Sequence, residues 1–320
     1  MCALFGWIYH SNSLSQKALR KLTSALANAA ESRGTDATGI AYNFCGKLHI
    51  YKKPRAAHKM HLNFPMEVSA LMGHTRMATQ GDEKHNYNNH PFFGRCDKRF
   101  ALAHNGVLYN DKELRKNHQL PQTQIETDSY VAVQLIEKHP KLCFDALKDM
   151  AEAVRGSFTF TILDDSNTLW FVKGSSPIYI VYLPELSLYV YGSTKEIVNF
   201  GLKCAGLQRM MRVEIEAKEG ELLRIPSCGR LERSSFQFAK ERFGYPHCFN
   251  TDYESEYLLD YFSSFGYARE DIELLLDFGY SVLEIEEMLM DPMEFRAAVA
   301  DVRCCLEGEY GDEIGSIYAW

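Results

Sequence analysis

Cys2 is a candidate nucleophile. A thiolate attacks well, but an ordinary thiol pKa of about 8.5 leaves little thiolate at neutral pH, so a base has to remove the proton. If Met1 is removed, the α-amino group of Cys2, with an ordinary pKa of roughly 7.7 to 8.0, can act as that base through one water. Cys2 would then supply both the attacking atom and the base. Taken alone, a second-position cysteine is more often a small buried apolar residue.

Four polar segments lie at the ends of predicted strands, where loops on a rigid scaffold commonly carry functional side chains. They are 32–39 (SRGTDATG), 73–82 (GHTRMATQGD), 89–92 (NHPF) and 102–108 (LAHNGVL). A fifth polar segment, 126–128 (ETD), begins a predicted helix. Together with Cys2, these segments contain the groups that hydrolysis of a zwitterionic amide requires.

Asn105 and Gly106 offer hydrogen-bond donors for a developing negative charge. Attack on an amide carbonyl produces an oxyanion, and losing one donor to it typically costs about 2.7 to 4 kcal/mol. Asn-Gly is also a strong signal for a tight hairpin turn. The next residues, VLYN, do not clearly return as a partner strand. Both interpretations therefore remain open.

Arg76 and Asp128 could bind the two charged ends of an amino acid. A guanidinium group can hold a carboxylate through two hydrogen bonds, and a carboxylate can hold an ammonium group. Thr79 and the backbone of Gln80 lie close enough to Arg76 in the sequence to add donors. Taken singly, such an arginine is more often part of a structural ion pair, and an aspartate in ETD is more often a helix N-cap.

The order and local sequence of these segments resemble the class II glutamine amidotransferases, the N-terminal-nucleophile family whose glutaminase domains begin with Met-Cys. The resemblance covers residues 1 to about 225. Its segments are MCALFGWI, RGTDATGIA, GHTRMATQG, NHPF, HNGVLYN, ETDSYV, GSFTFTIL and KGSSPIYI.

The resemblance implies three groups of site residues and neither a cofactor nor a metal. The catalytic group, a nucleophile and an oxyanion hole, is Cys2, Asn105 and Gly106. The group that binds the α-carboxylate and α-ammonium of glutamine is Arg76, Thr79, Gln80 and Asp128. The group expected to be structural near the site is Arg33, Gly34, Asp36 and His90, and His104 is also expected to be structural.

The predicted elements divide the chain into a domain (1–225), a polar linker (226–250) and a helical region (251–320). In the first part, strands and paired helices favour an α+β sandwich of sheets covered by helices. The resemblance implies the αββα sandwich of antiparallel sheets found in N-terminal-nucleophile hydrolases. The last part is predicted to be a small all-α region, a possible partner-docking module, in which Gly279 ends one helix.

The 320 residues have a net charge of −7, with 46% hydrophobic and 24% charged residues, which is typical of a globular protein. The charge argues against a nucleic-acid or acidic-membrane partner. No stretch approaches the roughly 20 apolar residues of a membrane helix and no secretory signal is recognised, so a cytoplasmic location is expected. The nine cysteines include no C-x-x-C pair, so neither a disulfide framework nor a zinc site is predicted.

Family enzymes usually continue into a synthase domain that consumes ammonia, but no such signature is recognised after residue 225. We therefore expect L-glutamine as the substrate and a separate synthase protein as the ammonia acceptor. A stand-alone glutaminase or related amide hydrolase is the enzymatic alternative. A non-catalytic glutamine sensor or scaffold, acting through its helical tail, is the alternative from another class.

Overall fold

The computed structural model describes residues 2–11, 13–238, 259, 263, 267–280, 284–285, 288 and 293–303. The chain divides into two compact units, Met1–Ala239 and Lys240–Trp320. Among the described residues, none of the helices has the length and apolar character needed to cross a bilayer. The predicted processing of Met1 and the second half of the predicted linker, 239–250, fall outside the described residues.

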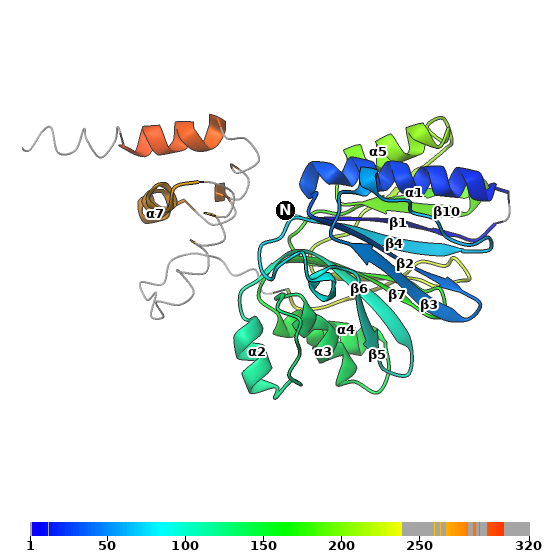
Figure 1. The fold of residues 1–320 in the computed structure, drawn as a ribbon, viewed down its shortest axis with the longest axis horizontal. Helices are drawn as coiled ribbons and strands as arrows, with labels where there is room; N and C mark the ends of the chain where they lie inside the picture. Colours follow the sequence, from blue (N-terminus) through cyan, green and yellow to red (C-terminus); the bar gives the residue numbers. More distant parts are fainter. Residues whose placement is uncertain are drawn as a thin grey trace, which may run out of the picture. The chain divides into compact units, whose positions relative to one another are not determined.

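Seven strands form one antiparallel sheet in the order β11-β9-β10-β1-β4-β2-β3 (Figure 1). Their bounds are β1 Ala3–Tyr9, β2 Ala37–Phe44, β3 Lys47–Lys53, β4 Ala70–Arg76, β9 Tyr179–Leu183, β10 Leu188–Gly192 and β11 Val213–Ile215. Strand β1 is buried along its whole length. Phe5 and Trp7 pack toward the helices, whereas Leu4 and Ile8 pack toward the second sheet, as the two-residue period of a strand requires.

Six strands form the second antiparallel sheet in the order β13-β12-β8-β7-β6-β5. Their bounds are β5 Phe92–Arg95, β6 Arg99–Leu108, β7 Gly156–Asp164, β8 Leu169–Lys173, β12 Glu221–Ile225 and β13 Glu232–Ser235. Residues of both sheets, among them Met72 and Phe171, share one buried cluster. The two sheets therefore pack face to face.

Helices cover the outer faces of both sheets (Figure 1). Helices α1 (Gln16–Ala30) and α5 (Lys195–Cys204) share a core with the first sheet. Helices α3 (Tyr130–Glu137) and α4 (Phe144–Ala153) share a core with the second, and α2 (Asp111–Asn117) precedes them. The layers run helix, sheet, sheet, helix, so the predicted α+β fold with an αββα sandwich is confirmed.

Strand β13 lies inside the segment predicted as a linker, 226–250. Its residues alternate between half-buried and exposed positions and pair with β12, Glu232 lying opposite Arg224. Because β13 is an edge strand rich in polar residues, its sequence does not show the apolar alternation of a half-buried strand. The sheet therefore extends beyond Ile225, and the predicted linker begins too early.

In the second unit, α7 (Arg269–Phe278) ends at Gly279, which has the left-handed φ of 112°. The Tyr280 N–H donates to the Leu275 carbonyl at 2.9 Å and the Gly279 N–H donates to the Leu276 carbonyl at 3.1 Å. These two bonds form the glycine-ended cap that the sequence predicts. Residues 293–303 are also helical.

Candidate active site

The site lies at one end of the sandwich, where β1 begins and β4 ends. Cys2 immediately precedes β1, and Ala3 lies opposite Thr75 on β4, so Cys2 and Arg76 reach the same end of the sheet. Strand β6 brings Asn105 and Gly106 from the second sheet, and a hydrogen bond from His74 to the His104 carbonyl joins β4 to β6 at 2.9 Å. The charges of Arg76 and Asp128 both influence the Cys2 thiol.

The turn at 33–36 fixes the backbone on both sides of the thiol. Arg33 Nε donates to the Cys2 carbonyl at 3.0 Å, and Asp36 Oδ2 accepts the Ala78 N–H at 2.7 Å. A Cβ on Gly34 would lie 2.4 Å from the Arg76 carbonyl carbon and 2.5 Å from Met77 N, so only glycine fits against this backbone. The turn therefore sets the spacing between residue 2 and the end of β4.

The Cys2 thiol is partly buried, and its Sγ lies 3.5 Å from the Met77 carbonyl oxygen. Burial raises the pKa of Cys2, while contact with the Met77 backbone and the positive charge of Arg76 act in the opposite direction. Because the net pKa lies above the ordinary value, the thiol is mostly protonated at neutral pH. A base is therefore needed to generate the thiolate.

Arg76 is buried and held by the loop that follows it. Its Nη1 donates to Asn89 Oδ1 at 2.7 Å, and its Nη2 donates to the carbonyls of Gln80 at 2.5 Å and Gly81 at 2.9 Å. The two Nη2 hydrogens are thus accounted for, so a carboxylate that binds both Nη atoms has to compete with these carbonyls. Thr79 and Gln80 are half-buried in the same loop.

Asn89 owes its position to further bonds. Its Nδ2 donates to the Glu83 carbonyl at 2.8 Å, and Lys52 Nζ donates to the Asn89 and Pro91 carbonyls. Burial, with the charge of Arg76, lowers the pKa of Lys52 to about 8. The sequence marks Asn89 only as part of the segment NHPF and does not predict its bond to Arg76, because that bond joins two loops whose contact is not visible locally.

Asn105 and Gly106 lie inside β6 rather than at a turn, so the hairpin interpretation is wrong. Gly106 has a φ of 136°, and a Cβ there would lie 2.0 Å from the Ser157 carbonyl oxygen on β7. Side-chain Nδ2 of Asn105 is buried and has no hydrogen-bond partner among the described residues. An unpaired buried amide N–H costs free energy, so its retention is typical of a group that meets a ligand.

Asp128 is buried just before α3. Its Oδ2 accepts the Leu108 N–H at 2.6 Å and its Oδ1 accepts the Ser129 hydroxyl at 3.0 Å. Ser129, and not Asp128, occupies the cap position of α3, and it makes no side-chain capping bond. The N-cap interpretation of Asp128 is therefore wrong. Burial raises the pKa of Asp128, against the stabilising effect of the Leu108 N–H.

Three buried histidines lie behind these residues. The ring centroids of His74 and His90 are 4.3 Å apart, and neither ring nitrogen of His90 has a partner among the described residues. Burial lowers the pKa of His74 and of His104 to about 3 and that of His90 well below its ordinary value. All three rings are therefore neutral at neutral pH.

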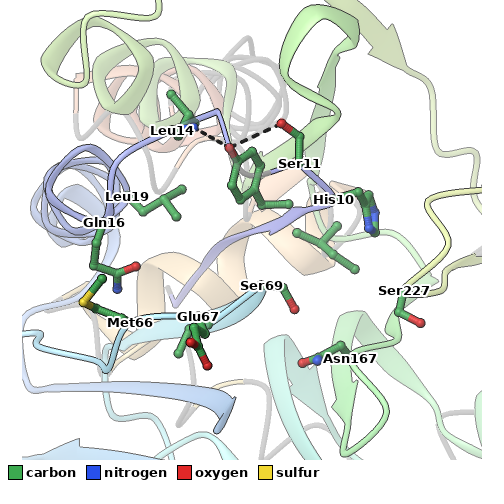
Figure 2. Close-up of a pocket in the computed structure, with 13 residues that line it drawn as sticks. His10, Ser11, Leu14, Gln16, Leu19, Met66, Glu67, Ser69, Asn167 and Ser227 are labelled. Carbon is green, nitrogen blue, oxygen red and sulfur yellow. Dashed lines mark hydrogen bonds between the residues drawn. The ribbon is translucent and has the colours of Figure 1, made fainter.

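A hollow of about 380 Å³ lies at the other end of β1 (Figure 2). Tyr9, His10, Glu67, Asn167 and Ser227 are among the residues that line it. It contains none of the residues predicted for the site. Among the described residues, no group of three histidine, cysteine or acidic side chains could hold a metal ion.

Comparison with known proteins identifies residues 74–199 as a glutamine amidotransferase domain. The glutamine–fructose-6-phosphate aminotransferase (isomerizing) of Sulfurisphaera tokodaii is 28% identical over 263 residues, which cover 77% of this chain and 44% of that protein. The enzyme of that name from Staphylococcus epidermidis is 33% identical over 191 residues, 56% of this chain and 30% of the enzyme. The chain thus spans less than half the length of these relatives.

Among solved structures, the glutamine phosphoribosylpyrophosphate amidotransferase of B. subtilis, complexed with ADP and GMP, superposes with a TM-score of 0.59 at 23% identity. The match covers 73% of this chain and 49% of that chain, and it shows that the two share a fold. With the four-layer sandwich and the matched domain, these similarities support the resemblance of the chain to the class II, N-terminal-nucleophile glutamine amidotransferases.

Proposed function

We propose that the chain hydrolyses the side-chain amide of L-glutamine through a thioester on Cys2. The observation that supports this most strongly is the meeting, at one end of the sandwich, of a partly buried thiol, a buried guanidinium and a buried carboxylate. Strand β6, whose Leu108 N–H binds Asp128, also carries an amide donor, Asn105 Nδ2, without a partner among the described residues.

Catalysis would begin when the α-amino group of a processed Cys2 takes the thiol proton and Sγ attacks the glutamine carboxamide carbon. The negative charge that develops on the amide oxygen would be bound by Asn105 Nδ2 and the Gly106 N–H. Collapse of this intermediate breaks the C–N bond, and the proton passes to the departing nitrogen to release ammonia. Water then hydrolyses the thioester to give glutamate and restore the thiol.

Recognition would use both charges of the substrate. Arg76, with donors from Thr79 and Gln80, would bind the α-carboxylate, and Asp128 would bind the α-ammonium. Since Cys2 must reach the carboxamide while both ends are held, asparagine, one methylene shorter, would be selected against. Arg33, Gly34, Asp36 and His90 would support the site without contacting the substrate.

The released ammonia would be passed to an acceptor on a separate synthase protein. The relatives' name, glutamine–fructose-6-phosphate aminotransferase, describes transfer of nitrogen to a sugar phosphate, and this chain spans less than half of their length. The cytoplasm is the expected location, because the six described cysteines are all free thiols. No feature of the described residues favours a glutamine sensor without turnover, and an assay of ammonia release distinguishes such a sensor from an enzyme.

The test is ammonia release from glutamine by full-length protein whose N-terminus has been confirmed by mass spectrometry to begin at Cys2. Cys2→Ala should lower the rate by at least about 1,000-fold, because the nucleophile acts as part of a unit. Cys228→Ala, which removes an exposed thiol, is the matched control and should leave the rate unchanged. A processed protein that binds glutamine but releases no ammonia would instead support the sensor alternative.

A further inference from the structure

A chain of hydrogen bonds runs from Asp128 into the core of the second sheet. Asp128 Oδ1 lies 3.0 Å from Ser129 Oγ, which lies 2.8 Å from His104 Nδ1. The other ring nitrogen of His104, Nε2, lies 3.3 Å from the Ser157 carbonyl oxygen. All three side chains, Asp128, Ser129 and His104, are buried.

Proton counting sets the direction of this chain. Ser129 has a single hydroxyl hydrogen, and an ionised Asp128, with no cation in contact among the described residues, is the stronger acceptor for it. Ser129 Oγ must then accept a hydrogen from His104, whose Nδ1 carries it. In this tautomer His104 donates to Ser129 Oγ through its shorter contact, at 2.8 Å. The unprotonated Nε2 then faces the Ser157 carbonyl oxygen at 3.3 Å without a hydrogen bond, because both atoms are acceptors.

Packing holds His104 in this position. Its ring stacks on Phe160 of β7, with centroids 4.6 Å apart and an interplanar angle of 25°. Its carbonyl accepts a hydrogen bond from His74 Nε2 at 2.9 Å. Because Asn105 follows His104 directly in β6, the same residue also connects the chain to the proposed oxyanion hole.

We propose that His104 and Ser129 are positioning residues that fix the orientation of Asp128 and keep it ionised to bind the α-ammonium group of glutamine. The inference rests on the proposed function, since it assigns Asp128 as the ammonium site. Without the Ser129 hydroxyl, Asp128 keeps only backbone donors among the described residues, the N–H groups of Leu108 and Ser129, so the carboxylate would rotate more freely and take up a proton more readily.

The test compares two ligands in the full-length protein, L-glutamine and glutaric acid monoamide, which lacks the amino group. Ser129→Ala should raise KM for glutamine about 10-fold and leave kcat nearly unchanged, while the KM for the monoamide stays the same. Ser129→Thr keeps the hydroxyl and should restore the glutamine KM. Equal losses with both ligands, or no loss with either, would overturn the proposal.

Two further measurements separate this inference from the proposed function. In a Cys2→Ala background, calorimetry gives the binding ratio of the two ligands without turnover, and Ser129→Ala should reduce it about 10-fold. Nitrogen-15 NMR of the imidazole should place the His104 proton on Nδ1 in the ligand-free protein. A proton on Nε2 would overturn the proposal even if the enzyme is active. If the protein releases no ammonia but Ser129→Ala still lowers the binding ratio of the two ligands about 10-fold, only the proposed function would be overturned.

Discussion

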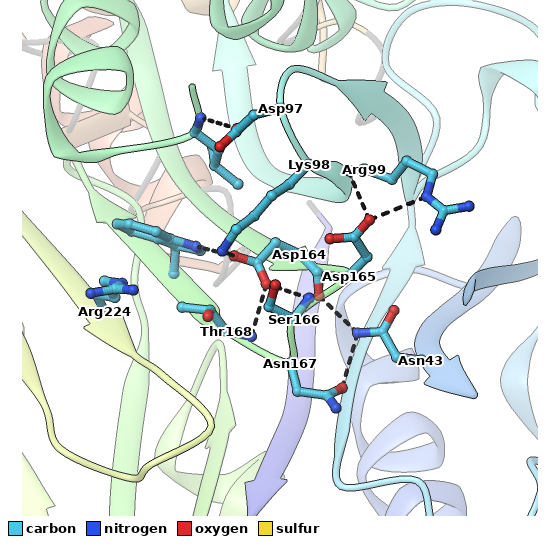
Figure 3. A network of polar contacts seen from close by, with 12 residues as sticks. Asn43, Asp97, Lys98, Arg99, Asp164, Asp165, Ser166, Asn167, Thr168 and Arg224 are labelled. Carbon is cyan, nitrogen blue, oxygen red and sulfur yellow. Dashed lines mark hydrogen bonds and ion pairs between the residues drawn. The ribbon is translucent and has the colours of Figure 1, made fainter. Parts of the chain in front are cut away.

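Two buried aspartates, at opposite ends of the sandwich, are treated differently by the fold. Asp164 is fully buried at the end of β7 (Figure 3) and receives hydrogen bonds from the Lys98 ammonium at 3.0 Å, Trp170 Nε1 at 3.4 Å and the Ser166 and Thr168 N–H groups at 2.8 and 3.1 Å. Asp128 receives the Leu108 N–H and the Ser129 hydroxyl, and the Ser129 backbone N–H also acts on it, so that all its donors among the described residues are neutral.

The difference separates a structural carboxylate from one prepared for a ligand. Four donors, one of them a cation, compensate Asp164 for the loss of water, so it can fix the β7–β8 turn. Asp128 is buried with neutral donors and no cation in contact among the described residues, so its charge is costly until an ammonium group arrives. Binding sites commonly retain such unfavourable charges at the expense of stability.

The largest expected effect is that of Asp128→Asn on activity. The amide keeps the size of the side chain but loses the charge, so kcat/KM for glutamine should fall about 1,000-fold, equivalent to roughly 4 kcal/mol. The free energy of unfolding, measured in urea, should stay the same or rise by about 1 kcal/mol, because an uncompensated buried charge is removed. A large loss of stability would show that Asp128 is structural like Asp164.

Lys98→Met should have the opposite profile. It leaves Asp164 buried without its cation, and since Lys98 is partly exposed we expect a loss of about 2 to 3 kcal/mol in unfolding free energy. KM and kcat for glutamine should remain within about twofold of the parent values at temperatures where the variant is folded. A change in KM for glutamine would contradict the view that the Asp164 end of the sandwich is structural and does not take part in substrate binding.

The pH dependence of the ligand-free protein should sharpen the comparison further. Because burial raises the pKa of Asp128 above its ordinary value of 3.8, the folded protein binds this proton more tightly than the unfolded chain. The contribution of Asp128 to stability therefore falls as pH rises through the raised pKa, while glutamine affinity, which needs the charge, should rise. Subtracting the pH profiles of Asp128→Asn from those of the parent should reveal both trends, and parallel profiles would contradict the assignment.

The smallest expected effect is that of Asn43→Ala, next to Asp164. Asn43 Nδ2 donates to the Asp164 carbonyl at 2.7 Å and to Asn167 Oδ1 at 2.9 Å. Loss of these bonds should cost about 1 to 2 kcal/mol of unfolding free energy. KM and kcat for glutamine should not change. As a control, glutamine should raise the thermal unfolding temperature of the variant as much as it raises that of the parent protein.

The sequence was sufficient for the fold class, because the order of strands and helices and the polar segments at strand ends agree with one architecture. It was insufficient for two local features. Asn105-Gly106 has the same local signal in a hairpin as in a long strand, and only the pairing of β6 with β7 decides between them. Asp128 has the local signal of an N-cap, but its Oδ2 instead bonds Leu108, twenty residues earlier.

Supporting residues were the least predictable part of the site. Asn89 acts on Arg76 and Ser129 contacts His104 across 13 and 25 residues respectively, and neither pair forms a recognisable local pattern. The edge strand β13 was missed for a related reason, since its pairing with β12 depends on backbone bonds that polar residues make as well as apolar ones.

The most direct test of the account is labelling of the processed chain with a diazo-ketone analogue of glutamine, followed by peptide mass spectrometry. We predict one adduct per chain, on the Cys2 sulfur, prevented by excess L-glutamine and strongly reduced in Asp128→Asn. Labelling that glutamine does not prevent, or that occurs equally at the exposed thiols of Cys45 and Cys228, would contradict the assignment of Cys2 as the nucleophile.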